Sequence, residues 1–322
     1  MPNRPECFFF ELTSPEMADM IACLHHGKVE VFSTGDAAQP LASPSLQQLA
    51  VVHERHANPR IVSVTRGRTS AELCYAVDSR GGTNVFAQVP GTGREQQLFH
   101  GADTRLSDLD FSPADEALAC TVAGDRGTSA IGVLSDDGKG MRTVTEGDVI
   151  DRAPRWMPGG RAEIVYSSAG IGRTKAGKAV GRAPFALHRL RFSDSSVEVL
   201  MSDAQYDYVA AVPLSDGLLY ALRRDYEGAP QGSAFAVVSR AFRGLFSGNA
   251  GPRPVFGRGH DLVRITPKGS ELVARDVLAF DVANSGDVVY SSQRGLFRIS
   301  ARQASLQPLA SLESVEQLVI YW

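Results

Sequence analysis

The segment at residues 172–179 reads GRTKAGKA and has the glycine and Gly-Lys spacing of a phosphate-binding loop. In such a loop, backbone N–H groups and the start of a following helix bind the phosphates, and a Ser or Thr after the lysine holds Mg²⁺. Ala179 stands where that hydroxyl is needed, and Gly181 and Pro184 would interrupt the helix. We therefore interpret the segment as a basic loop that can contact an anion or an acidic partner, rather than as a nucleotide site.

Histidine and cysteine spacing gives no metal or nucleophile motif. His53 and His56 lack the spacing of the H-E-x-x-H zinc motif, and none of the four cysteines forms a C-x-x-C pair. A G-x-S-x-G elbow, a dinucleotide fingerprint and an EF-hand loop are also missing from the sequence. The sequence predicts no catalytic residue, no metal ligand and no cofactor, although histidines from separate segments could still meet in space.

Three polar pairs stand at related points of an internal repeat, where an innermost strand begins. These pairs are Asp151 with Arg152, Tyr206 with Asp207, and Arg275 with Asp276. Glu316 and Gln317 occupy a related place near the C-terminus. Carboxylates and arginines that alternate around a central opening could bind a cation, a small molecule or a polar peptide. Equally, they could pair with one another as a structural ion-pair network.

Two insertions concentrate positive charge. The first, residues 170–188, contains Arg173, Lys175, Lys178 and Arg182 and no acidic residue. The second, residues 225–260, contains Arg240, Arg243, Arg253 and Arg258, with no acidic residue after position 229. Because the whole chain has a formal net charge of −3, these two segments differ strongly from the rest of the sequence.

The second insertion also has a helical pattern of apolar residues. Phe235, Val238, Phe242 and Leu245 recur at steps of three and four residues. The pattern predicts a short amphipathic helix over residues 233–246, whose apolar face packs on its own sheet or binds a partner.

The elements that would position these residues come from a repeat. FSPADEALACTV, from Phe111, and WMPGGRAEIVYSS, from Trp156, place Pro113 and Pro158 45 residues apart, each before a turn and an apolar strand. Each unit continues with two more short strands around a polar turn. Four strands in about 45 residues are typical of one β-propeller blade. Six units are predicted, at residues 8–46, 47–102, 103–148, 149–203, 204–275 and 276–322.

The C-terminal segment VEQLVIYW resembles the first strand of a unit that lacks its other strands. We expect it to pair with the N-terminal unit and close the ring, which removes exposed sheet edges. The strand directions place the two insertions, and a shorter extra segment at residues 44–59, on one face of the disc.

DLDFSPADEALACTV, APRWMPGGRAEIVYSS and AVDSRGGTNVFAQVPGTGREQQL resemble the repeats of TolB-like β-propellers. The resemblance covers nearly the whole chain, although Ser-Pro-Asp-Gly of the family pattern is only approximated, as SPAD and MPGG. It implies a propeller, commonly six-bladed, that holds peptides, proteins or small ligands on one face. It implies no single activity.

The chain ends and the composition indicate a soluble, cytoplasmic protein. The N-terminal sequence MPNRPECFFFELTSPE lacks a cationic region followed by a long apolar run, and no apolar run approaches the roughly 20 residues that span a bilayer. A secreted protein whose signal has been removed would look the same. The slightly negative net charge implies no attraction of the whole molecule to nucleic acid.

The sequence therefore predicts a non-catalytic propeller that recognises a protein or peptide through the face carrying the insertions. The surface residues expected there are Arg173, Lys175, Lys178, Arg182, Phe235, Arg240, Phe242, Arg243, Arg253 and Arg258. One alternative is an enzyme that uses the channel face, such as a metal-assisted lyase or hydrolase. Another is binding of nucleic acid or a different polyanion by the basic insertions.

Overall fold

Short strands separated by turns make up most of the described chain. The structure is a computed structural model that describes residues 20–33, 40–42, 59–92, 94–135, 140–228, 259–266, 269–301 and 305–321. In these ranges the one helical element is a 3₁₀ turn at Asp125–Gly127. The protein is all-β, as the repeats predicted.

Two sheets have four strands each. The first has the order β24-β1-β2-β3, with bounds Gln317–Tyr321, Met20–His25, Lys28–Ser33 and Pro40–Ala42. The second has the order β4-β5-β6-β7, with bounds Arg60–Arg66, Leu73–Ser79, Gly82–Gln88 and Glu95–Ala102. In the first sheet, β24 pairs antiparallel with β1, so that Leu318 lies opposite Cys23. The C-terminal strand and the N-terminal hairpin therefore share one sheet.

A nine-stranded sheet contains two further groups of strands. The first group is β8 (Leu106–Ser112), β9 (Ala117–Ala123), β10 (Ser129–Ser135) and β11 (Met141–Thr143). The second is β12 (Val149–Trp156), β13 (Glu163–Arg173), β14 (Ala179–Arg182), β15 (Ala186–Arg191) and β16 (Val197–Met201). A single parallel contact between β10 and β12 joins the two groups.

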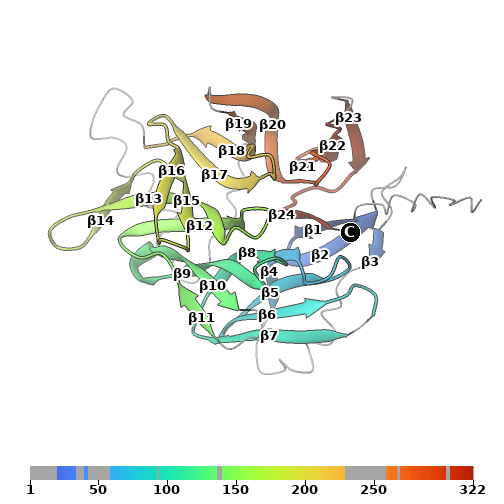
Figure 1. Cartoon of the computed structure of the whole chain (residues 1–322), viewed down its shortest axis with the longest axis horizontal. Coiled ribbons are helices and arrows are strands. Elements are labelled where there is room, and N and C mark those ends of the chain that lie inside the picture. Colours follow the sequence, from blue (N-terminus) through green and yellow to red (C-terminus); the bar gives the residue numbers. More distant parts are fainter. Residues whose placement is uncertain are drawn as a thin grey trace, which may run out of the picture.

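The last sheet has seven strands in sequence order. They are β17 (Tyr206–Pro213), β18 (Leu219–Asp225), β19 (His260–Thr266), β20 (Gly269–Val282), β21 (Val288–Ser292), β22 (Gly295–Ile299) and β23 (Leu306–Ala310). The 14-residue strand β20 pairs with β19 through its first part and with β21 through its last part. Figure 1 shows the strand groups side by side around a common centre.

Strands β4, β8, β12, β17 and β20 each contain a register shift against the next strand. Asp108, Ala153 and Ala210 adopt positive φ angles of 51°, 51° and 52° at three of these points. A bulge bends the strand and leaves backbone N–H groups without ladder partners. The bulges therefore create a need for side-chain acceptors along these strands.

Side chains of neighbouring strands supply those acceptors. The N–H of Val64 on β4 donates to Gln317 on β24 at 2.9 Å, and the N–H of Leu109 on β8 donates to Ser63 at 2.8 Å. The N–H of Trp156 on β12 donates to Asp110 at 2.7 Å. Each such bond joins one strand group to the next and satisfies a buried backbone donor.

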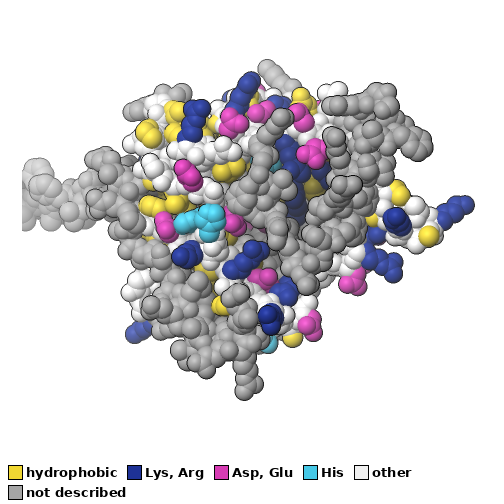
Figure 2. Space-filling model, turned by 180° about the vertical axis from the view of Figure 1, so that it is seen from behind, with side chains coloured by type: hydrophobic (Ala, Val, Ile, Leu, Met, Phe, Trp, Pro, Cys, Tyr) yellow, Lys and Arg dark blue, Asp and Glu magenta, His cyan; other side chains and the backbone are white. Residues whose placement is uncertain are grey.

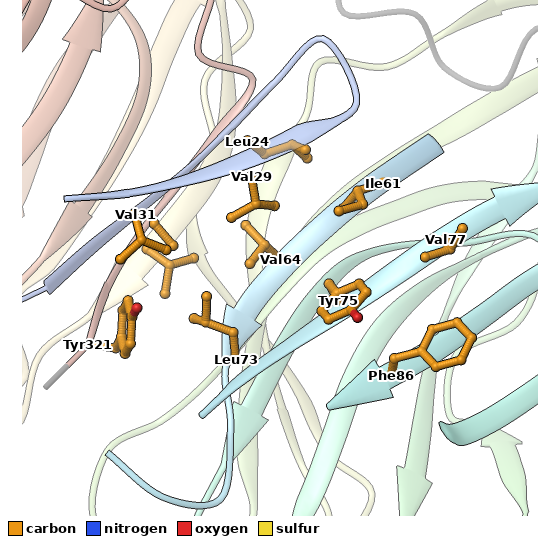
Figure 3. Packing of buried hydrophobic residues seen from close by; sticks show 12 residues of the cluster. Leu24, Val29, Val31, Ile61, Val64, Leu73, Tyr75, Val77, Phe86 and Tyr321 are labelled. Atoms are coloured by element: carbon orange, nitrogen blue, oxygen red, sulfur yellow. The ribbon is translucent and has the colours of Figure 1, made fainter. Parts of the chain in front are cut away.

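The core consists of apolar layers between neighbouring sheets. Successive residues of a strand point to opposite faces. On β1, Ala22 and Leu24 join a cluster with β4 and β5, whereas Ile21 and Cys23 join a cluster with β21 and β22. Figure 3 shows the first of these layers, in which Leu24 and Val29 face the strand that carries Val64. Full burial of one such side chain contributes about 1.5–3 kcal/mol, so the sheets are held together mainly by these layers.

The segment that resembles a phosphate-binding loop is a β-hairpin. Strands β13 and β14 pair across it, and the turn is closed by hydrogen bonds from the Thr174 N–H to the Lys178 carbonyl and from the Gly177 N–H to the Thr174 carbonyl, both 2.8 Å. No helix follows it, since β14 leads on to β15. The structural context that phosphate binding requires is therefore missing, and residues 174–178 form the turn between the two strands.

Candidate functional site

Asp207, on β17, is a buried carboxylate held by two arginines. Its side chain is 1% exposed and accepts two hydrogen bonds from Arg182, at 2.7 and 2.6 Å. The Nε of Arg224 donates to it at 3.2 Å, and the Phe185 N–H donates to it at 2.8 Å. Burial raises the pKa of Asp207, but Arg182, the Phe185 amide and Arg224 together outweigh burial and hold that pKa below its ordinary value. The ionised carboxylate therefore fixes two guanidinium groups in place.

Aromatic rings support the same guanidinium groups. The Cζ atom of Arg182 lies 4.5 Å from the centre of the Phe185 ring and 5.1 Å from that of Tyr226. The Tyr226 hydroxyl donates a hydrogen bond to the Arg182 carbonyl. Cation–π contacts of this kind orient an arginine without neutralising it.

Arg152, on β12, adds a third positive charge. Its Cζ lies 4.1 Å from the centre of the Phe185 ring, the side chain is half-buried, and it forms no ion pair with any described residue. The pKa of Arg152 is lowered to about 10, mainly by burial; Asp108 and Asp207 act to raise it, and the positive charges of Arg224 and Arg182 act to lower it. Arg152 is still charged at pH 7, and no carboxylate of a described residue forms an ion pair with its donors.

His260, at the start of β19, lies close to these groups. Its Nδ1 is 3.4 Å from the Val277 carbonyl oxygen. Burial lowers the pKa of His260, and the positive charges of Arg224 and Arg152 add to this effect. The imidazole is therefore neutral at pH 7. We name Arg152, Arg182, Asp207, Arg224 and His260 the cationic cluster.

The cationic cluster can recognise an anion. The cluster contains three guanidinium groups and one carboxylate, to which only Arg182 and Arg224 bond directly, so it has an excess of positive charge and of N–H donors. Arginines arranged in this way bind carboxylates or phosphates through charge-assisted hydrogen bonds. Figure 2 shows Lys and Arg side chains near the middle of one face of the molecule.

Only one member of each of the first two predicted pairs belongs to this cluster. Arg152 and Asp207 do, whereas Asp151 lines a separate cavity and Tyr206 contacts Arg223, whose Cζ lies 4.6 Å from the Tyr206 ring centre. Neighbours on a strand point to opposite faces. The two residues of each of these pairs therefore contact different groups of side chains, and their binding role at a central opening stays a prediction.

The other predicted polar residues lie elsewhere. Arg275 and Asp276 are exposed on β20 and form no ion pair with a described residue. The Glu316 N–H donates to the Leu24 carbonyl at 2.7 Å, and the Gln317 side chain accepts from Ser63 and Val64. Glu316 and Gln317 therefore bind the C-terminal segment to β1 and β4, and we name these contacts the joint between the chain ends.

The first basic insertion is only partly free to bind. Arg173 pairs with Asp148 at 2.7 Å, and Arg182 pairs with Asp207, whereas Lys175 and Lys178 are exposed at the hairpin turn. Figure 2 shows this hairpin as a projection at the right-hand edge. Two of the four charges are thus compensated within the chain.

Residues 229–258 of the second basic insertion lie outside the described residues. So do the predicted helix at 233–246, the extra segment at 44–58, and the candidate residues Phe235, Arg240, Phe242, Arg243, Arg253 and Arg258. Their placement on the face of the cationic cluster stays a prediction.

Sequence reasoning missed Arg224, Phe185, Tyr226 and His260 as members or supports of the cluster. Arg224 had a findable signal, because β17 and β18 form a hairpin whose register sets Asp207 opposite Arg224. Phe185 and Tyr226 come from the hairpin segment and the end of β18, and no spacing in the sequence connects them.

The described ranges contain neither a metal-ligand group nor a membrane-spanning helix. No group of three or more His, Cys, Asp or Glu side chains there is arranged to hold a metal ion. None of the described helices has the length and apolar character that a membrane crossing needs.

Comparison with known proteins gives the fold. No family model and no curated protein matches the sequence. TolB from Acinetobacter baumannii is a similar solved structure, with a TM-score of 0.61, 14% identity, and coverage of 94% of this chain and 66% of that chain. This chain thus spans just under two thirds of that TolB.

Other propellers give similar agreement. A chain of a nidogen/laminin complex has a TM-score of 0.59 at 8% identity, and a putative TolB from Agrobacterium tumefaciens has 0.54 at 13%. In both cases 95% of this chain and 98% of that chain are covered. The chain has the TolB-like β-propeller fold, and the resemblance predicted from the repeats is confirmed at that level.

Proposed function

We propose that the chain is a six-bladed propeller, with the blade limits that the repeats predict, and that β24 closes its ring as the innermost strand of the N-terminal blade. The pairing of β24 with β1 supports this reading, as does the apolar layer that Ile21 and Cys23 share with the last sheet. A closed ring holds its centre rigid, which suits a site assembled from several blades.

We further propose that the protein is a binding scaffold whose cationic cluster recognises an acidic peptide segment of a protein partner. One observation carries this proposal: Arg152 is half-buried, oriented by Phe185 and without a carboxylate partner among the described residues. Holding a charge in a partly desolvated place is costly unless an opposite charge arrives. A carboxylate of the partner would supply that charge.

The insertion face would extend the contact. Lys175 and Lys178 are exposed on the β13–β14 hairpin, which also contributes Arg182 to the cluster. Exposed lysines contribute mainly to the rate of association and to salt dependence, whereas a semi-buried arginine decides how long the complex lasts. The partner's identity and a cytoplasmic location both stay predictions.

The test is a binding titration by fluorescence anisotropy with a labelled peptide of eight glutamates. Arg152→Gln should weaken binding about tenfold or more, which corresponds to about 1.4 kcal/mol. Lys178→Gln, at an exposed site, is the matched control and should change affinity less than threefold. Circular dichroism checks that both variants fold.

Equal losses for both variants would refute the anchor role of Arg152. A steep salt slope together with tight binding of single-stranded DNA or heparin would instead favour the polyanion alternative. The metal-assisted enzyme alternative draws no support from the described residues, which lack a grouped ligand set.

A further inference from the structure

A second site lies between two strand groups, away from the cationic cluster. A cavity of about 460 Å³ is bounded by β11 and the β11–β12 connection on one side, and by β12, β13 and β15 on the other. Its volume is within the range of pockets that bind small molecules. Its polar lining includes Asp151, Tyr166, Ser168 and His188, and its apolar lining includes Leu190 and Val197.

The sheet register places the polar groups on one face. Asp151 lies opposite Ser168 across β12 and β13, and Tyr166 lies opposite His188 across β13 and β15. Ser168 and Tyr166 are two residues apart on β13, so they share a face. The Tyr166 and His188 ring centres are 5.6 Å apart. These side chains therefore form one continuous polar floor.

The Asp151 carboxyl group lacks a full set of partners. The residue is 2% exposed, and its Oδ1 has no hydrogen-bond donor in the described part of the chain. Burial raises the pKa of Asp151, while the Ser168 and Thr145 hydroxyls and His188 act in the opposite direction. A buried carboxylate oxygen without a donor is costly and calls for a ligand that donates.

The neighbours of Asp151 are acceptors as well. Burial lowers the pKa of His188, so its ring is neutral and can accept one hydrogen bond. Burial, with a smaller contribution from Asp151, raises the pKa of Tyr166, so its hydroxyl stays protonated and its oxygen can accept. A carboxylate, an imidazole and a phenol together match a group with several donors and a positive charge.

The two arginines of the lining do not donate to the Asp151 carboxyl group. Arg191 is engaged by Glu163 at 3.3 Å and by Glu198 at 2.9 Å. Arg142 is exposed, and its Cζ lies 5.3 Å from the Phe192 ring centre. The charge at the rim would repel a second cationic group, so a ligand with one positive end fits best.

We propose that this cavity binds a small aliphatic primary amine, whose ammonium group donates to Asp151 Oδ1 and whose hydrocarbon part lies against Leu190 and Val197. An ammonium group has three donors and no acceptor. The amine could be a free small molecule or the side chain of a lysine on a peptide, and the cavity volume favours the free molecule.

Isothermal titration calorimetry with n-pentylamine tests the proposal, with 1-pentanol as the neutral control. Millimolar or tighter binding of n-pentylamine is expected, with 1-pentanol at least about tenfold weaker. Absence of binding, or equal binding of both probes, would overturn it. If only the lysine analogue Nα-acetyl-lysine methylamide binds, the free-amine assignment is wrong and a peptide lysine is the source.

Variants locate the site. Asp151→Asn should weaken n-pentylamine binding at least about tenfold. Val197→Arg adds a charge at the cavity wall and should also weaken n-pentylamine binding about tenfold. Because Val197 is 52% exposed, this variant should fold even if the Asp151→Asn variant does not. Val199→Arg, 55% exposed on the same strand but outside the lining, is the matched control. Loss in all three variants, or in none, contradicts the assignment.

Discussion

Replacing Asp207 by Asn tests the reasoning about the cationic cluster most directly. The carboxylate is 1% exposed and accepts four hydrogen bonds, two of them from Arg182 at 2.7 and 2.6 Å. An asparagine keeps the shape, but it loses the charge and turns an NH₂ group toward guanidinium donors. Breaking a buried ion pair on one side costs about 3–5 kcal/mol, because the remaining charge is left unpaired.

The measurement is urea unfolding followed by circular dichroism at pH 7. Asp207→Asn should lower the free energy of unfolding by about 3–5 kcal/mol. The control is Glu271→Gln, which removes a partner of Arg264 from a pair at 2.5 Å whose side chains are 54% and 43% exposed. A surface pair of this kind contributes about 0–1 kcal/mol.

The effect of the same substitution on the free energy of unfolding should depend on pH, in a direction that follows from the lowered pKa of Asp207. Because the folded-state pKa of Asp207 is depressed, its stabilisation is present above the unfolded-state value and is lost as pH falls through the folded-state value. The difference between wild type and Asp207→Asn should therefore shrink below about pH 4. A loss no larger than that of Glu271→Gln, or a difference that stays constant from pH 7 to pH 3, would refute the description of Asp207 as the ionised anchor.

Two further predictions concern the joint between the chain ends and the buried thiols. Gln317→Ala removes the acceptor of the Ser63 hydroxyl and the Val64 N–H, so it should lower the free energy of unfolding by about 1–3 kcal/mol in a urea titration. The control Gln307→Ala, at an exposed position of β23, should have almost no effect. Equal effects of the two substitutions would count against the joint. In a Cys7→Ser background the three described cysteines, all of them buried, should not react with iodoacetamide at pH 8 until the protein is unfolded. The reason is that burial shields the thiols and, aided by Asp108, raises the pKa of Cys120 to about 12. Rapid labelling of the native protein would contradict this prediction.

Several features follow from the sequence because they depend on local signals. Apolar alternation and turn residues predicted the short strands, and the repeat of Pro113 at Pro158 predicted the propeller-type units. Ala179 excluded a phosphate-binding loop, since it removes the hydroxyl that would hold Mg²⁺. The apolar character of residues 318–321 predicted a paired C-terminal strand, and β24 does pair with β1.

The composition of the candidate sites was decided only by the tertiary structure. Asp151 and Arg152 are adjacent in sequence, yet one lines the cavity and the other joins the cationic cluster, because neighbouring side chains on a strand point to opposite faces. A bulge follows these residues on β12 and changes which face of the sheet the later side chains point to. No local signal in the sequence predicts this bulge. Phe185 joins Arg152 to Arg182 only because β12 and the β14–β15 connection meet in space, and contacts between distant segments depend on packing rather than on spacing along the chain.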